Sequence, residues 1–285
     1  MQSKSWLAAG AVLLALLLPA NAAQNRDGKQ EQPQPFASAP AGFDAKREGI
    51  EHGKMETIDY ESKVSGGMRK MVVYTPPGYN AANKYPVFYL LHGGGDNETG
   101  WQQKGAADII LDNLYADKKI VPMIVVMPNG FPTKGGDKAA KGKGGGSLFE
   151  DDLLKDIIPY VESHYSMLTS SNERALAGLS MGAGQTLNVG LKHLDKFSWL
   201  GAFSGGGGKA ANLISDEAAV KKLRLFWISS GDKDQLAFKG SESLHNTLAA
   251  KNIPHVWHID SGGHTWPVWK NDLYLIAQML FRDRK

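Results

Sequence analysis

The sequence contains no cysteine among its 285 residues. This absence excludes disulfide bonds, a cysteine nucleophile and lipid attachment through a cysteine. Stability must therefore come from a buried core, which a domain of this size can supply without cross-links. The sequence also lacks a strong excess of either charge, since its formal net charge is only +3. A balance so close to neutral gives no indication of nucleic-acid binding.

Two further absences concern ligands. The eight histidines do not pair at the spacing that metal ligands usually show. No Gly-Lys-Ser/Thr sequence ends a glycine-rich segment, which argues against a nucleotide-binding phosphate loop. We therefore expect neither a metal ion nor an organic cofactor. The sequence shows no internal repeat and no separate carbohydrate-binding module, and it does not indicate an oligomeric state.

The N-terminal segment has the pattern of an export signal. An apolar run covers residues 7–18, after Lys4 and before the small residues at 20–22. This pattern predicts a cleavable signal peptide over residues 1–23 and a secreted or periplasmic protein, with no stable membrane anchor, because the run is short for a membrane span. Residues 24–42 are rich in Gln, Pro and Ala, which predicts a disordered linker. A single catalytic domain is then expected over residues 43–285.

Ser180 is the candidate nucleophile. It lies in Gly-Leu-Ser-Met-Gly at residues 178–182, between an apolar run that predicts a strand and a stretch compatible with a helix. Glycines on both sides permit the tight turn that exposes a nucleophilic serine between strand and helix. Ser204 matches a looser form of this motif, but more glycines and no immediate helix follow it. We therefore favour Ser180 and interpret Ser204 as part of a strand-end loop near the pocket.

A serine hydroxyl needs a base and an orienting acid to become a nucleophile. A predicted strand at 223–230 runs into two candidate acids, Asp232 and Asp234. We favour Asp234, because it has more room to turn toward a histidine, whereas Asp232 could simply cap the turn. The next predicted strand, at 254–260, ends in a glycine pair that leads into His264, the candidate base. The order serine, acid, histidine is that of the α/β-hydrolase fold.

Acyl transfer also requires donors for the oxyanion that develops on the carbonyl oxygen. One donor is expected to be the backbone N–H of Met181, directly after the nucleophile. The other should come from the loop after an earlier strand, where a histidine and three glycines occupy residues 92–95. We assign Gly94 as this second donor.

The pattern of strands and helices predicts the fold. Strands are expected at 56–60, 68–74, 87–91 and 123–127, and before Ser180, Ser204, Gly231 and Ser261. Helices are expected notably at 150–165, 241–251 and 273–282. This alternation is typical of a mostly parallel central sheet with helices on both faces, in agreement with an α/β-hydrolase fold.

Four segments together resemble carbohydrate esterase family one, which includes feruloyl esterases and acetyl xylan esterases. These segments lie at residues 91–95, 149–160, 178–182 and 262–269. The resemblance implies a metal-free serine esterase that removes feruloyl or acetyl groups from acylated plant polysaccharide or oligosaccharide. It places the triad on Ser180, Asp234 and His264, and the oxyanion hole on Gly94 and Met181. The alternatives are an acyltransferase like the related mycolyltransferases, and a catalytically silent carbohydrate-binding protein.

Two tryptophans and one loop bear on the substrate. Trp101 follows the oxyanion loop and Trp266 follows His264, so each could stack on a sugar or a phenolic acyl group, or equally fill the core. Trp227 and Trp269 are interpreted as core residues. The loop at 130–147 is longer and richer in lysine than the family resemblance leads us to expect. We interpret it as a solvated loop in preference to one that binds acidic sugar substituents.

Overall fold

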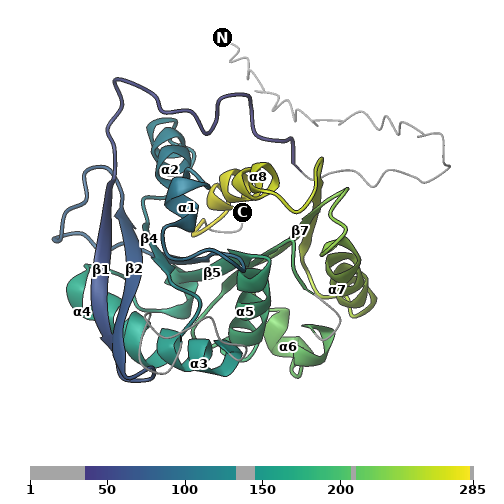
Figure 1. The fold of residues 1–285 in the computed structure, drawn as a ribbon. Coiled ribbons are helices and arrows are strands. Elements are labelled where there is room, and N and C mark those ends of the chain that lie inside the picture. The colour runs from purple at the N-terminus through teal and green to yellow at the C-terminus, as the bar shows by residue number, and fades with distance from the viewer. Residues whose placement is uncertain (1–35, 133–144, 207–209, 283–285) are drawn as a thin grey trace, which may run out of the picture. The chain divides into compact units, whose positions relative to one another are not determined.

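The computed structural model of the protein describes residues 36–132, 145–206 and 210–282 (Figure 1). The predicted signal peptide at 1–23, most of the predicted linker and the lysines of the 130–147 loop lie outside these residues. Contacts group residues 34–285 into one unit. Among the described residues, no helix has both the length and the apolar character needed to cross a membrane.

An eight-stranded sheet runs through the described part of this unit. Its spatial order is β1-β2-β4-β3-β5-β6-β7-β8. Both pairings of β2 are antiparallel, and all pairings from β4 to β8 are parallel. The strands are β1 (Lys54–Ser62), β2 (Gly67–Thr75), β3 (Val87–Leu91), β4 (Ile124–Pro128), β5 (Arg174–Leu179), β6 (Trp199–Phe203), β7 (Leu225–Gly231) and β8 (Val256–Asp260). The predicted fold class is thereby confirmed, and each expected strand is present.

Helices cover both faces of the sheet, as Figure 1 shows. They are α1 (Gly100–Gln103), α2 (Ala107–Ala116), α3 (Gly145–Asp152), α4 (Ile158–His164), α5 (Met181–Gly190), α6 (Glu217–Val220), α7 (Phe238–Ala250) and α8 (Trp266–Ala277), with a π-helical turn at Leu153–Ile157. Side chains of α1, α2 and α8 pack in one apolar cluster, and those of α3 to α7 pack in another. The sheet separates these two clusters.

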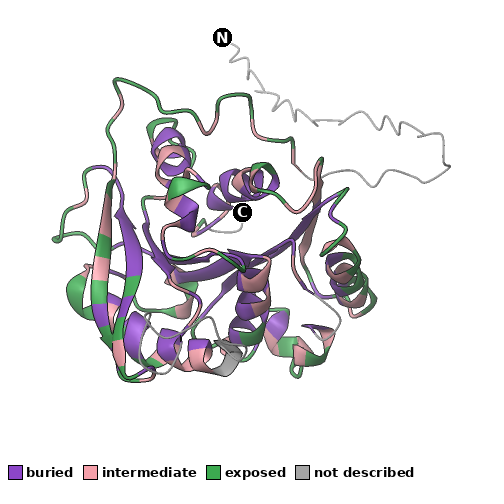
Figure 2. Ribbon diagram, in the orientation of Figure 1, coloured by how far each residue is buried: buried purple, intermediate pink, exposed green. Residues whose placement is uncertain are grey.

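The central strands are buried from both sides, which explains why they are almost continuously apolar. In β3, Val87, Tyr89 and Leu91 belong to one cluster, while Phe88 and Leu90 belong to the other. Every residue of β3, β4, β5, β6 and β7 is buried. Figure 2 shows the buried sheet and the exposed outer faces of the helices. The carboxyl ends of the parallel strands meet at one edge, and the candidate catalytic loops follow from there.

Two sequence-based boundaries differ from the structure. The last helix was expected at 273–282, whereas α8 begins at Trp266 and ends at Ala277. Pro267 occupies the first turn of this helix, where its missing N–H removes no helical hydrogen bond. Helices α1, α2 and α6 were not predicted.

The other difference concerns the N-terminal limit of the packed domain. Residues 36–42 were assigned to a disordered linker, but they lie on the domain surface. The ring of Phe36 is 5.7 Å from that of Trp227. The backbone N–H of Ala39 donates to Oδ1 of Asn271 at 2.6 Å. Two apolar contacts and a hydrogen bond to α8 therefore fix a segment whose composition alone indicated disorder.

Candidate active site

Ser180 occupies a strained turn between β5 and α5. Its backbone has φ 52° and ψ −110°, a region that residues with a Cβ rarely adopt. Its N–H donates to the carbonyl of Phe203 at 2.9 Å, which fixes the turn against the neighbouring strand. A Cβ at Gly178 would lie 2.7 Å from the backbone carbon of Gly182, and one at Gly182 would lie 2.6 Å from the carbonyl of His92. The two glycines are therefore required for the close approach of strand and helix.

The structure brings Ser180, His264 and Asp234 together at the ends of three strands. The Nε2 atom of His264 lies 2.8 Å from Oγ of Ser180, and its Nδ1 atom lies 2.8 Å from Oδ2 of Asp234. Because a carboxylate only accepts hydrogen bonds, the ring proton resides on Nδ1 and leaves Nε2 free to accept from the serine hydroxyl. This is the arrangement in which a histidine can remove a proton from serine.

Asp234 is held on both of its oxygens. Oδ1 accepts the backbone N–H groups of Leu236 and Ala237 at 3.0 and 2.9 Å, while Oδ2 faces His264. Burial raises the pKa of this carboxyl, but the hydrogen bonds from His264 and Ala237 outweigh it and hold the pKa of Asp234 below its ordinary value. The carboxylate therefore stays ionised and is positioned to stabilise a charged imidazole.

Packing holds the histidine ring as well. The ring of Trp269 meets that of His264 edge to face, with centroids 5.0 Å apart. Trp269 and Trp227 are both buried, as predicted for core residues.

The candidate oxyanion donors come from the start of α5 and from the loop after β3. Met181 is the first residue of α5, and the first N–H groups of a helix have no partner within it. Gly94 is exposed in the loop after β3. A Cβ built on the preceding Gly93 would lie 3.4 Å from Cβ of Ser180, so this loop borders the nucleophile directly. Two backbone N–H groups near one serine can stabilise an oxyanion.

The competing residues occupy other positions. Asp232 accepts the N–H of Gly262 on its Oδ1 at 2.8 Å, and thus joins the loop of the acid to the loop of the base. Among the described residues, the hydrogen bond and ion pair at Nδ1 of His264 come from Asp234 and not from Asp232. Ser204 also has a positive φ, of 48°, but its side chain is fully buried at the end of β6. The structure therefore brings Asp234 and Ser180, and not these alternatives, to the imidazole.

The two tryptophans proposed to stack on substrate differ in their exposure. Trp101 is 1% exposed, its indole N–H donates to the carbonyl of Leu91 at 3.0 Å, and its ring meets those of Phe203 and Trp266 edge to face. The expectation that Trp101 stacks on substrate is therefore corrected, because almost none of its side chain is accessible to a substrate. Trp266 is partly exposed at the start of α8 and remains a candidate.

A polar network beside the oxyanion loop was not predicted from the sequence. His92, Gly130 and Gln185 come from three separate segments and are all buried. Their hydrogen bonds connect the loop after β3, the segment after β4 and helix α5. A glutamine five residues after the nucleophile could have indicated a polar contact near the site. Its partner Gly130 lies 55 positions away in the chain, so the sequence does not show the pairing.

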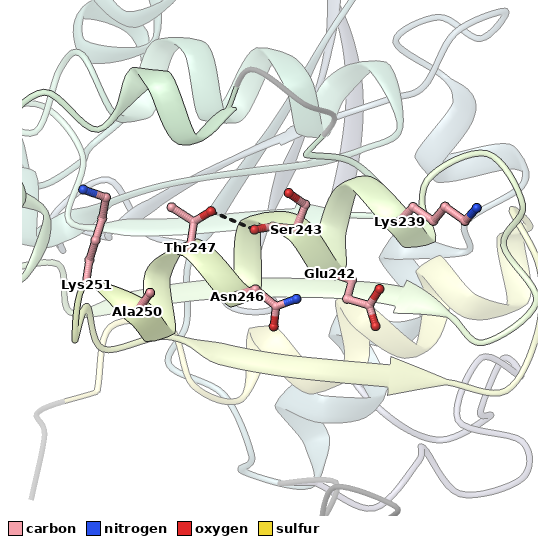
Figure 3. A pocket seen from close by; sticks show the side chains of 7 residues that line it. All are labelled: Lys239, Glu242, Ser243, Asn246, Thr247, Ala250 and Lys251. Atoms are coloured by element: carbon pink, nitrogen blue, oxygen red, sulfur yellow. Dashed lines mark hydrogen bonds between the residues drawn. The ribbon is translucent and has the colours of Figure 1, made fainter. Parts of the chain in front are cut away.

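A shallow hollow of about 460 Å³ lies along the outer face of α7, and Figure 3 shows its lining. Seven residues line it: Lys239, Glu242, Ser243, Asn246, Thr247, Ala250 and Lys251. None of them belongs to the candidate triad or oxyanion hole. Across the three described ranges, no three His, Asp or Glu side chains are arranged to hold a metal ion.

Comparisons with known proteins agree with this geometry. A family model described as "Putative esterase" matches residues 62–280. A curated endo-1,4-beta-xylanase/feruloyl esterase of Xylanibacter ruminicola is 35% identical over 246 residues, which cover 84% of this chain and 33% of the relative. The chain thus spans about a third of the length of that relative.

Solved structures give a closer match in length. The CE1 ferulic acid esterase of the anaerobic fungus Anaeromyces mucronatus, without substrate, has a TM-score of 0.77 at 28% identity, covering 87% of this chain and 98% of that chain. Its complex with ferulic acid has a TM-score of 0.76 at 28% identity, covering 88% and 98%. These comparisons confirm the resemblance to carbohydrate esterase family one.

Proposed function

The chain belongs to the esterase family, and from this premise we propose that it is a serine esterase that hydrolyses feruloyl esters on plant cell-wall polysaccharide. The observation that carries the proposal is the unbroken hydrogen-bonded series from Ser180 through His264 to Asp234. The similarity to ferulic acid esterases supports the feruloyl group over the acetyl group.

The proposed reaction begins with attack of Ser180 Oγ on the ester carbonyl carbon. Nε2 of His264 accepts the hydroxyl proton as the new C–O bond forms. Asp234 retains its negative charge and stabilises the resulting imidazolium through Nδ1. The carbonyl oxygen becomes an oxyanion and accepts the N–H groups of Gly94 and Met181, a stabilisation that typically contributes several kcal/mol when the donors are fixed in advance.

Collapse of this intermediate releases the sugar hydroxyl. His264 returns its proton to the leaving oxygen, and the feruloyl group stays on Ser180 as an acyl-enzyme. A water molecule then enters, His264 removes its proton, and a second tetrahedral intermediate releases ferulate and restores the serine. We further propose that the protein acts after export, on the basis of the signal pattern at residues 1–23.

The test measures ferulate release from a feruloylated arabino-oligosaccharide and acetate release from acetylated xylan. We expect a higher kcat/KM on the feruloyl ester, and labelling of Ser180 by an organophosphonate in step with loss of activity. Higher activity on acetylated xylan would contradict the assignment of the feruloyl group and support the acetyl group. Transfer of the acyl group to an added alcohol in preference to water would support an acyltransferase instead.

Addition of a chelator tests whether the activity depends on a metal ion. Activity should survive it, because each step above uses only side chains and backbone N–H groups of this chain. Loss of activity that added zinc or calcium restores would contradict the mechanism. Absence of turnover on both substrates and on a generic aryl ester would indicate a silent binding protein.

A further inference from the structure

The second oxyanion donor is connected to helix α5 by three consecutive hydrogen bonds. Nε2 of Gln185 donates to the carbonyl of Gly130 at 2.7 Å, and the N–H of Gly130 donates to Nε2 of His92 at 2.8 Å. Nδ1 of His92 lies 2.8 Å from the carbonyl of Gly93. We call Gln185, Gly130 and His92 the clamp. Its residues lie outside the triad and its last bond ends next to Gly94.

The clamp fixes one tautomer of His92. A backbone N–H can only donate, so Nε2 of His92 must be the accepting nitrogen and the ring proton must be on Nδ1. Burial lowers the pKa of His92, the charge of Arg69 acts in the same direction, and Asp96 and the Gly93 carbonyl oppose them. The neutral ring therefore donates from Nδ1 to the carbonyl of Gly93.

This bond determines where the N–H of Gly94 points. The Gly93 carbonyl also accepts the N–H of Asp96 at 3.3 Å, so two donors hold it in place. In a planar trans peptide, the carbonyl of one residue and the N–H of the next point in opposite directions. Fixing the carbonyl of Gly93 thus directs the N–H of Gly94 away from His92.

Position 130 is fitted closely to its partners. A Cβ built on Gly130 would lie 3.0 Å from Oε1 of Gln185, 3.1 Å from Cε of Met181 and 3.4 Å from Nε2 of His92. The guanidinium of Arg69 also donates to the backbone carbonyls of the residues before and after Gly130, residues 129 and 131. Because Gln185, His92 and Arg69 all bond to residues 129–131, a displacement of Gln185 should also move His92.

We propose that Gln185 is a positioning residue for the oxyanion hole. Helix α5 carries Met181, the first donor, at its start and Gln185 one turn later, so the same helix sets the positions of both donors relative to Ser180. The proposal rests on the proposed esterase function, because it assigns Gln185 a role in that reaction.

The decisive variant is Gln185→Glu. When protonated, the introduced carboxyl group can still donate to the Gly130 carbonyl. When ionised, it can only accept hydrogen bonds and cannot bond to that carbonyl. Burial should raise the pKa of the introduced carboxyl group into the pH range of the assay. We expect kcat of this variant relative to the wild type to fall, on the order of tenfold to a hundredfold, as the pH rises from 5 to 9. This loss is smaller than the roughly 10²- to 10³-fold that removal of an oxyanion donor costs.

Asn188→Asp is the matched control, since it makes the same chemical change on the exposed side of the same helix. Its kcat relative to the wild type should stay flat with pH. Gln185→Leu, which cannot donate at any pH, should lower kcat at every pH with little change in KM. It should weaken inhibition by a boronic acid, which forms a tetrahedral adduct at Ser180, much more than it weakens binding of ferulate.

Two results would overturn the proposal. One is a pH-independent ratio for Gln185→Glu, and the other is an equal loss of boronic acid and ferulate affinity in Gln185→Leu. A wild-type protein without esterase activity would refute the proposed function itself, which separates the two failures.

Discussion

Asp234 lies 2.8 Å from Nδ1 of His264, whereas Asp232, two residues earlier, bonds to the backbone N–H of Gly262 in the loop that carries this histidine. One aspartate thus orients the imidazole, and the other joins its loop to the loop after β7.

Asp234→Asn is therefore expected to lower kcat by about 10⁴-fold, because the amide favours the wrong imidazole tautomer. Asp232→Asn keeps an oxygen that can accept from Gly262 and should retain most of the activity. Both variants are compared by kcat on an aryl ester. A larger loss at Asp232 would overturn the assignment of the acid.

For the nucleophile, Ser180→Ala should fold normally and lose activity by several orders of magnitude. Ser204→Ala should keep much of its activity, since that hydroxyl is buried beside Asp234 and it is Ser180, not Ser204, that faces Nε2 of His264. Initial rates and circular dichroism of both variants provide the measurement. The assignment fails if the two variants behave the other way round.

The two tryptophans should respond differently to substitution. Trp101→Phe loses the hydrogen bond to Leu91 and leaves a small cavity, so a destabilisation of about 1–3 kcal/mol is expected, with an unchanged preference between feruloyl and acetyl esters. Trp266→Ala should lower kcat/KM more on the feruloyl ester, because a planar ring gains from stacking. Equal losses on both esters would assign Trp266 to the scaffold.

Asp272 provides a prediction about stability and pH. Its side chain is fully buried in α8, where its Oδ1 accepts the indole N–H of Trp227 at 3.3 Å. Burial raises the pKa of Asp272 well above its ordinary value, and the charge of Asp260 adds to this. The folded state thus holds this proton more tightly than the unfolded state. The stability gained is complete below the unfolded pKa of about 3.9 and is lost as the pH rises toward the folded pKa.

Asp272→Asn removes this titration and keeps a neutral side chain of the same shape. Relative to the wild type, the variant should therefore gain stability between pH 5 and pH 8, by up to about 1.4 kcal/mol per pH unit over the titrating range. Urea unfolding midpoints at the two pH values give the comparison. A stability difference between variant and wild type that stays constant between pH 5 and pH 8 would mean that the folded protein holds Asp272 ionised over this range.

Much of the fold was predictable because local pattern and packing agree. The parallel strands are short apolar runs that end in glycine or polar loops, and each was located within a few residues. The start of α8 was not, because Trp266 and Pro267 match both a loop motif and a first helical turn. The packing of Phe36 was hidden as well, since composition does not reveal the groove that an isolated aromatic residue occupies.

For the site, the residue types and their order could be predicted from the sequence, and the structure adds their separations. Spacing favoured Asp234 but left Asp232 as an alternative, because both follow the same strand. The burial of Trp101 depends on Phe203 and Trp266, which come from other parts of the chain. Contacts of this kind are set by the tertiary fold and leave no local pattern.

The backbone of Ser180 has an evolutionary consequence. Its φ of 52° and ψ of −110° are the mirror image of an ordinary extended conformation, which costs serine of order 1–3 kcal/mol and glycine very little. With Ser180 as the proposed nucleophile, the need for its hydroxyl would retain a side chain at this position, although the backbone conformation favours glycine. In descendants that keep the scaffold only for binding, the first replacement expected at position 180 is glycine. A glycine at this position in a related sequence would indicate a protein that has lost the esterase activity and gained stability.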